Sequence, residues 1–178
     1  MKTIAFSGSN SSRSINQKLV NYISEQINET EIEVIKLTDY KLPMFSEDEE
    51  TKGFPEDLTK LHQKIQEADF LIISTPEHNG ILPAFFKNVI DWLSRLDYSF
   101  LKGKKVFVIS ASPGKQGGAG ALHILKKLLP HFGAEIIGEF SLGNFQENFN
   151  DGNRGVKDMK SKLSSVLVES LDKLHLAV

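Results

Sequence analysis

Three short segments of the chain gather hydroxyl, amide, imidazole and glycine residues directly after apolar runs. They read SGSNSSRSIN at 7–16, TPEHNG at 75–80 and SASPGKQGG at 110–118. A plain turn needs only two or three such residues, so segments of this length indicate backbone that is shaped to hold a ligand. Their side chains offer hydrogen bonds to a phosphate or to a flat polar ring, and no evident nucleophile.

The first segment suits a phosphate held at the start of a helix. Hydroxyls, amides and helix N-terminal N–H groups attract an anion, and the helix dipole adds to this attraction. Neither Gly-Lys-Ser/Thr nor G-x-G-x-x-G is present, so we expect a phosphate that is held rather than transferred. The simpler alternative is that Ser14 is only an N-cap, with Gln17 completing a capping box.

The other two segments favour close approach of backbone to a flat ring. In TPEHNG the N–H groups of Asn79 and Gly80 can face a ring, because glycine leaves the backbone uncovered. His78 and Glu77 are open to two interpretations, acid–base chemistry or ordinary packing and hydrogen bonding. The glycines of the 110–118 segment permit the same approach, or they form only a flexible connection.

These segments must be positioned by the elements that precede and follow them. Apolar runs and helical stripes alternate along the chain, which predicts an α/β fold with a parallel sheet between helices. With strand order 2-1-3-4-5, the three segments leave neighbouring strands and share one crevice at their carboxyl ends. We expect a single domain, 1–178, with strands at 3–8, 31–37, 69–75, 104–112 and 134–141, a long loop at 38–55, and helices at 14–28, 56–67, 82–96, 118–131 and 154–174.

Composition excludes several classes of function. A net charge of −2, from 21 basic and 23 acidic residues, argues against a nucleic-acid-binding protein. The chain has no cysteine and no His/Asp/Glu cluster with metal spacing, so we expect no metal site. The N-terminus has an apolar run of only three residues, and no later run is long enough for a membrane span. These features predict a cytoplasmic protein without nucleic-acid or membrane partners.

Four stretches together resemble the NADPH-dependent FMN reductase family, the flavodoxin-like flavoproteins that include chromate, quinone and azo-dye reductases. They are GSNSSRSIN (8–16), LPMFSEDEE (42–50), PEHNGILPAFFKNVIDWLSR (76–95) and SASPGKQGGAGA (110–121), in family order over about residues 1–145. The resemblance implies a flavodoxin-like three-layer sandwich with a five-stranded parallel sheet of order 2-1-3-4-5. It also implies non-covalent FMN, NAD(P)H as co-substrate and a homodimer or homotetramer.

The resemblance also implies the roles of individual residues. Three groups follow: Ser9, Ser11, Arg13, Ser14, Ile15 and Asn16 at the phosphate; Pro76, Glu77, His78, Asn79 and Gly80 along the flavin ring; and Ser110, Ser112, Gly114 and Gly117 on its other side. The family often has arginine where Ser11 and Gly120 stand, and usually tyrosine where His78 stands.

The activity implied is a ping-pong transfer of hydride from NAD(P)H through FMN to a quinone, azo compound, flavin or metal ion. No catalytic side chain is expected, because the cofactor carries the chemistry. One alternative is a flavodoxin-type electron carrier without its own NAD(P)H turnover, although −2 is a weak charge for docking on redox partners. Another is a regulatory protein that uses FMN only structurally.

The helix at 82–96 also suggests how subunits pair. Its core stripe is Leu82, Phe85, Phe86, Val89, Ile90 and Leu93, and Trp92 lies about 100° from Leu93 in helical projection. Tryptophan is enriched in interface hot spots. We therefore expect Trp92 to point away from the core and to anchor a subunit interface.

Overall fold

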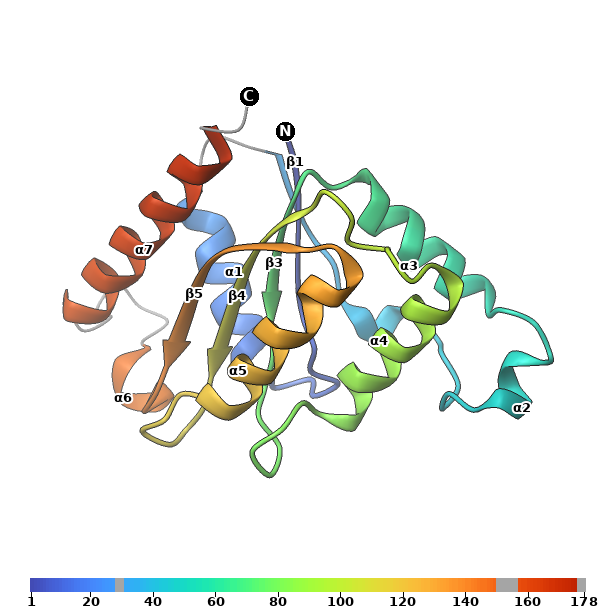
Figure 1. Cartoon of the computed structure of the whole chain (residues 1–178). Helices are drawn as coiled ribbons and strands as arrows, with labels where there is room; N and C mark the ends of the chain where they lie inside the picture. The colour runs from blue at the N-terminus through green and yellow to red at the C-terminus, as the bar shows by residue number, and fades with distance from the viewer. Residues whose placement is uncertain (28–30, 150–156, 176–178) are drawn as a thin grey trace.

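A computed structural model describes residues 1–27, 31–149 and 157–175, with one five-stranded sheet at its centre (Figure 1). All neighbouring strands are parallel and their order is β2-β1-β3-β4-β5, which confirms the predicted topology. The strands are β1 (Lys2–Ser7), β2 (Glu31–Val34), β3 (Phe70–Ser74), β4 (Lys105–Ala111) and β5 (Glu135–Leu142).

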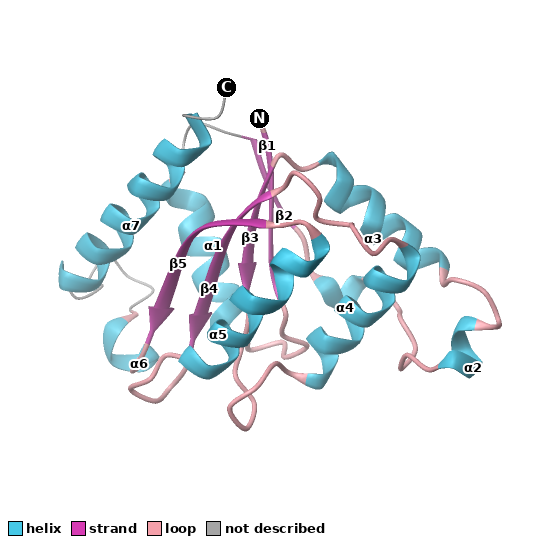
Figure 2. Ribbon diagram, viewed as in Figure 1, coloured by secondary structure: helices cyan, strands magenta, loops and turns pink. Residues whose placement is uncertain are grey.

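Helices cover both faces of this sheet (Figure 2). One face carries α1 (Ile15–Gln26) and α7 (Lys157–His175), and the other carries α3 (Glu56–Glu67), α4 (Ala84–Leu96) and α5 (Ala119–Leu128). Two hydrophobic clusters fill the spaces between the layers. The structure is therefore the parallel sheet between helices that the alternation predicted, in the flavodoxin-like form that the family resemblance implied.

The burial of each strand follows its place in the sheet. Strand β3 lies in the middle, and all five of its residues, FLIIS, are buried. Both of its faces lie under helices, which is why it reads as a continuous apolar run. Strand β2 lies at the edge, and its four residues are exposed or half-buried. The central position of β1, β3 and β4 sets the place of the three polar segments.

Several short elements and boundaries differ from the prediction. The expected loop at 38–55 contains most of the 3-10 turn η1 (Leu37–Asp39) and all of the short helix α2 (Glu47–Glu50), and α6 (Phe145–Asn148) follows β5. Helix α5 ends earlier than expected and continues as the 3-10 turn η2 (Leu129–Phe132), where Pro130 supplies no N–H for a helical hydrogen bond. Residues 154–156 of the last predicted helix lie outside the described residues.

The prediction for Trp92 is wrong. Its side chain is 0% exposed, and Nε1 donates a hydrogen bond to the carbonyl of Pro43 at 2.8 Å. The rings of Phe45 and Phe54 meet it edge-on, with centroids 5.2 and 6.5 Å away. The segment between η1 and α3 lies over this flank of α4, so a residue off the main stripe is still covered by the same chain. Trp92 therefore anchors a loop within the subunit.

Candidate functional site

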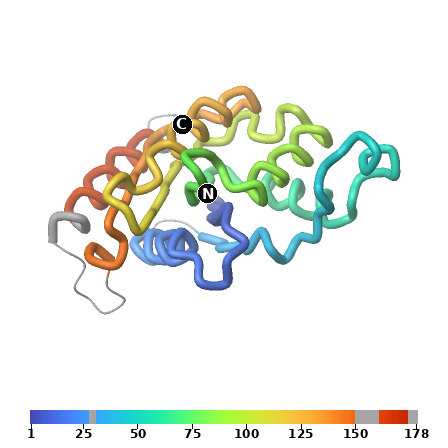
Figure 3. Tube along the Cα trace, turned by 90° about the horizontal axis from the view of Figure 1, so that it is seen from below, coloured from blue at the N-terminus to red at the C-terminus, as the bar shows by residue number. Residues whose placement is uncertain are grey.

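The three polar segments meet at the carboxyl edge of the sheet, as Figure 3 shows in a view along the strands. The N–H of Gly8 donates to the carbonyl of Ser74 at 2.7 Å, which ties the first loop to the end of β3. The N–H of Thr75 donates to the carbonyl of Ile109, and the Ser110 hydroxyl donates to the carbonyl of Thr75. These bonds hold the three strand ends together, so the expected convergence of the loops is present.

The first loop is folded by its own hydroxyl groups. Ser9 Oγ accepts from the N–H of Ser11, and Ser11 Oγ accepts from the N–H of Arg13, both at 3.2 Å. Ser14 is the N-cap of α1, and its Oγ accepts from the N–H of Gln17 at 3.1 Å. Ser14 is therefore an N-cap, as the simpler interpretation predicted. The positive end of the α1 dipole also points toward this loop.

Two donors at the start of α1 are available to a ligand. Among the described residues, the backbone N–H groups of Ile15 and Asn16 have no hydrogen-bond partner. Helix N-termini always leave such orphan donors, which are satisfied by caps, water or an anion. The Arg13 side chain is exposed beside them. Backbone donors, hydroxyls and a guanidinium therefore surround one small region, which is the donor set of a phosphate site.

The resemblance implies that Asn16 contacts a phosphate, but its side chain is buried and hydrogen-bonded within the protein. It is 2% exposed; Oδ1 accepts from Ser74 Oγ at 2.8 Å and from the N–H of Ala111 at 2.9 Å. Nδ2 donates to the carbonyl of Ala111 at 2.9 Å. The amide thus joins α1 to the ends of β3 and β4. Of the polar groups of Asn16, the backbone N–H is left for a ligand within the described residues.

The TPEHNG segment forms a tight hairpin. His78 and Ile81 make a two-residue antiparallel bridge, with N–H to carbonyl distances of 3.0 and 3.1 Å. The two residues between them, Asn79 and Gly80, have φ values of +52° and +80°. Positive φ at both central positions defines a type I′ turn, for which Asn-Gly is the preferred pair. Their N–H groups have no partner among the described residues, and the His78 side chain is exposed.

Glu77 links this hairpin to the next loop. Its Oε2 accepts a hydrogen bond from the N–H of Ala121 at 3.0 Å, in the first turn of α5. The N-cap of α5 is Gly118, which has no side chain to cap the helix, so Glu77 supplies the missing acceptor. A Cβ at Gly120 would lie 2.8 Å from Oε2 and 2.7 Å from the carbonyl of Gly80. Glycine at 120 therefore permits this close approach.

The loop after β4 is fixed on its inner side by hydrogen bonds from the chain that follows β5. The carbonyl of Gly114 accepts from Ser112 Oγ at 3.0 Å and from the N–H of Asn144 at 2.9 Å. Gly117 has a φ of +63°, and a Cβ there would overlap the Ser141 hydroxyl. A Cβ at Gly114 would meet nothing closer than 3.9 Å. The loop is fixed underneath while its outer backbone stays uncovered.

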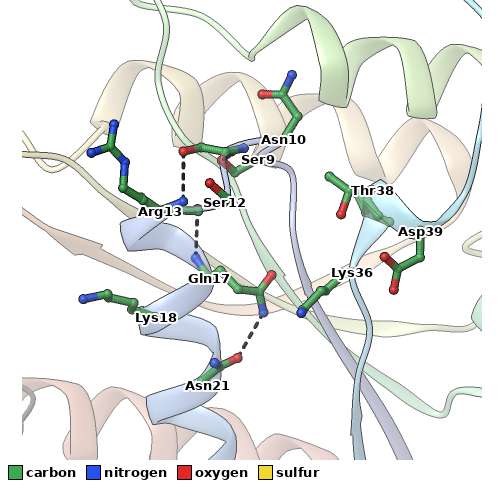
Figure 4. A pocket seen from close by; sticks show the side chains of 13 residues that line it. Ser9, Asn10, Ser12, Arg13, Gln17, Lys18, Asn21, Lys36, Thr38 and Asp39 are labelled. Atoms are coloured by element: carbon green, nitrogen blue, oxygen red, sulfur yellow. Dashed lines mark hydrogen bonds between the residues drawn. The ribbon is translucent and has the colours of Figure 1, made fainter.

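A groove of about 580 Å³ runs from the first loop along α1 to the segment after β2 (Figure 4). Residues 9–14 line one end of it, and Lys36 and Asp39 line the other. Gln17, Lys18 and Asn21 of α1 form its side. The end of the groove at Lys36 and Asp39 was not predicted, because a single lysine after an edge strand matches no recognisable binding motif.

The part of the chain that the structure describes contains neither a metal-binding cluster nor a membrane-spanning helix. Within residues 1–27, 31–149 and 157–175, no group of three His, Asp or Glu side chains is arranged to hold a metal ion. No helix in these same ranges is long and apolar enough to cross a membrane.

A flavodoxin-like sheet with phosphate donors and uncovered loop backbone at its carboxyl edge defines a nucleotide-binding α/β protein. The sequence model of one family, the NADPH-dependent FMN reductases, matches residues 1–147. The chain belongs to this family. The match confirms the family, the oxidoreductase class and the pairing of FMN with NAD(P)H that the four stretches implied.

Named relatives agree with this assignment. The NADH:(hydroxy)cinnamate reductase subunit CrdA of Vibrio ruber is 31% identical over 165 residues, which cover 90% of this chain and 80% of that protein. A quinone reductase of Escherichia coli K12 is 37% identical over 97 residues, 54% of this chain and 52% of its own. The solved structure of the flavoenzyme NAD(P)H:(acceptor) oxidoreductase FerB of Paracoccus denitrificans has a TM-score of 0.74 and 28% identity, covering 95% and 94% of the two chains.

The residues at the carboxyl edge fit FMN. Its phosphate matches the orphan N–H groups of Ile15 and Asn16, the serine hydroxyls and the Arg13 guanidinium. Its flat ring matches loops that carry glycine at 80 and 114, where a Cβ would meet nothing close. The flavin N1 and carbonyl oxygens are acceptors, and the N–H groups of Asn79 and Gly80 are donors.

Proposed function

We propose that this protein is an NAD(P)H-dependent FMN oxidoreductase that reduces a quinone, azo compound, flavin or metal ion in a ping-pong cycle. The observation that carries the proposal is the junction of three loops at the ends of β1, β3 and β4. The Glu77 to Ala121 hydrogen bond fastens the second loop to the helix that follows the third. When bound, FMN supplies a ring that accepts hydride from NAD(P)H and delivers it to the acceptor.

The chain's own residues bind and orient the cofactor. We assign the phosphate to Ser9, Ser11, Arg13 and Ser14 together with the N–H groups of Ile15 and Asn16. We assign one border of the ring to Pro76–Gly80, and the other to Ser110, Ser112, Gly114 and Gly117. The unpaired N–H groups of Asn79 and Gly80 place partial positive charge at a fixed position, which favours negative charge on a neighbouring ligand.

The proposal extends to the organisation of the protein. One sheet runs through the described residues and α7 packs on β5, which supports one domain over 1–178. Homodimer or homotetramer formation now rests on the family and on exposed apolar side chains. Ile81 is 57% exposed directly after the hairpin, and Met44 is 69% exposed on the segment that Trp92 anchors. Light scattering tests the oligomeric state. We also propose that the protein is cytoplasmic.

Steady-state kinetics separate this function from its rivals. The FMN-loaded protein should oxidise NADPH or NADH in the presence of a quinone, with parallel double-reciprocal plots when both substrates are varied. An electron carrier would accept electrons from a separate reductase but not from NAD(P)H. Mass spectrometry of the released cofactor should find FMN, and FAD would contradict the single phosphate site.

A further inference from the structure

We propose that the groove between α1 and the segment after β2 binds the 2′-phosphorylated adenosine of NADPH, and that Lys36 selects NADPH over NADH. The inference rests on the proposed function, since it names the preferred reductant of that same site. It concerns a wall of the groove that the FMN assignment does not use. Lys36, Thr38 and Asp39 form this wall, and Gln17 and Asn21 of α1 lie across from it (Figure 4).

The charge of the groove is the first argument. The wall that the FMN assignment does not use carries one cation, Lys36, and one carboxylate, that of Asp39. Lys36 makes no ion pair within the described residues, and its side chain is exposed. Elsewhere, many cations are matched by acids, as in the pairs of Lys87 with Asp91 and of Arg95 with Glu50. Unmatched cations inside a concavity attract an anionic ligand.

The size and polarity of the groove are the second argument. About 580 Å³ lies within the range of roughly 300–1,000 Å³ for small-molecule sites, and is more than a lone phosphate needs. Its other groups are amides, a hydroxyl and the Asp39 carboxylate. The amides and the hydroxyl can donate to ribose hydroxyls, and the amide oxygens and the carboxylate can accept from ribose hydroxyls and from the adenine amino group. An adenosine with an added phosphate uses both these polar groups and the Lys36 cation.

The position of the groove is the third argument. Its upper end consists of residues 9–14, which belong to the FMN phosphate loop. Strand β2 is the neighbour of β1, and Lys36, two residues after β2, lines the same groove as that loop. An adenosine bound in this groove would therefore adjoin the FMN phosphate loop, at the same carboxyl edge of the sheet as the two loops assigned to the flavin ring.

Adenosine fragments test the groove by itself. The FMN-loaded protein is titrated calorimetrically with adenosine 2′,5′-bisphosphate and with 5′-AMP, which differ by the 2′-phosphate. We expect the bisphosphate to bind about tenfold tighter, the scale of one charge-assisted contact. Lys36→Gln should bring the two affinities within about twofold, and Lys36→Arg should keep most of the difference.

The matched control is a variant that loses a lysine charge outside the groove. Lys102 is exposed in the turn before β4, at the opposite edge of the sheet, and Lys102→Gln should leave the discrimination intact. In kinetics, the ratio of kcat/KM for NADPH to that for NADH should fall in Lys36→Gln and stay unchanged in Lys102→Gln. The binding and kinetic measurements together separate the selectivity of the groove from the activity of the enzyme.

Three results would overturn the inference. They are equal binding of the two fragments by the wild type, equal losses in Lys36→Gln and Lys102→Gln, and competition by inorganic phosphate as strong as by the bisphosphate. Discrimination between the fragments without any NAD(P)H oxidation would refute the proposed function instead, and would leave the groove as a site for 2′-phosphoadenosine.

Discussion

The carboxylate of Glu77 caps α5 from another loop, accepting the N–H of Ala121 at 3.0 Å. It thereby couples the hairpin after β3 to the helix that starts after β4. Gly118 and Gly120 make the contact possible, because side chains there would collide with Ser110 and with Glu77 itself. This hydrogen bond therefore ties the two borders assigned to the flavin ring to each other, in addition to the bonds of Thr75 with Ile109 and Ser110.

Removal of this cap should weaken both the fold and the cofactor site. Glu77→Ala leaves the Ala121 N–H without its acceptor, and loss of an N-terminal cap costs about 0.5–2 kcal/mol of unfolding free energy. FMN affinity should fall as well, because the hairpin loses its tie to α5. Urea unfolding and fluorescence titration with FMN measure the two effects. Glu25→Ala, at an exposed position on α1, is the control, and equal behaviour of both variants would refute the coupling.

The type I′ turn gives a matched pair of glycine substitutions. Gly80 and Gly53 have φ values of +80° and +100°, and a Cβ at either position would meet nothing within 4 Å. Alanine at each should cost about 1–2 kcal/mol through backbone strain alone. Only Gly80→Ala should also weaken FMN binding, because only Gly80 lies in the hairpin. Unchanged FMN affinity in Gly80→Ala, despite the loss of stability, would place the ring away from this turn.

Ser14→Asp separates the capping of α1 from phosphate binding. Aspartate is as good an N-cap as serine, so the stability of the apoprotein should be kept. Its charge lies beside the proposed phosphate position and should weaken FMN binding by on the order of 1–3 kcal/mol. Riboflavin, which lacks the phosphate, should bind both proteins equally. A matching loss of affinity for riboflavin would show that the substitution disturbs the loop instead.

Asn16→Ala tests whether its amide holds the sheet or the ligand. The substitution leaves the N–H and carbonyl of Ala111 and the hydroxyl of Ser74 without their partner. Each unsatisfied buried group costs about 1–3 kcal/mol, so unfolding of the apoprotein should become easier by about 3 kcal/mol or more. The exposed Asn21→Ala is the control, with a change within about 0.5 kcal/mol. Full apoprotein stability with lost FMN affinity would restore Asn16 as a phosphate ligand through its side chain.

The parallel sheet was predictable because burial sets the sequence pattern directly, whereas its strand order followed from the family resemblance. A central parallel strand such as FLIIS must be apolar throughout, and the polar segments after β1, β3 and β4 mark the shared edge. Helices α2 and α6 have four residues each and are too short to show a 3.6-residue period. The Asn79-Gly80 pair is a hairpin signal that the sequence does contain, and it identifies the turn.

Individual side chains were less predictable than elements. Helical projection gives the direction of Trp92 relative to α4, but not the segment that covers that flank. Asn16 has the same local sequence whether its amide binds a ligand or ties strand ends together. Glu77 and Ala121 are far apart in the chain, so their contact exists only after the sheet has brought their loops to one edge.

An anaerobic titration of the FMN-loaded protein with NADPH tests the central claim most directly. The account predicts that stoichiometric NADPH bleaches the visible flavin absorbance and that a quinone then restores it. A protein that binds no FMN, or that binds FMN whose spectrum NADPH and NADH leave unchanged, would contradict the account.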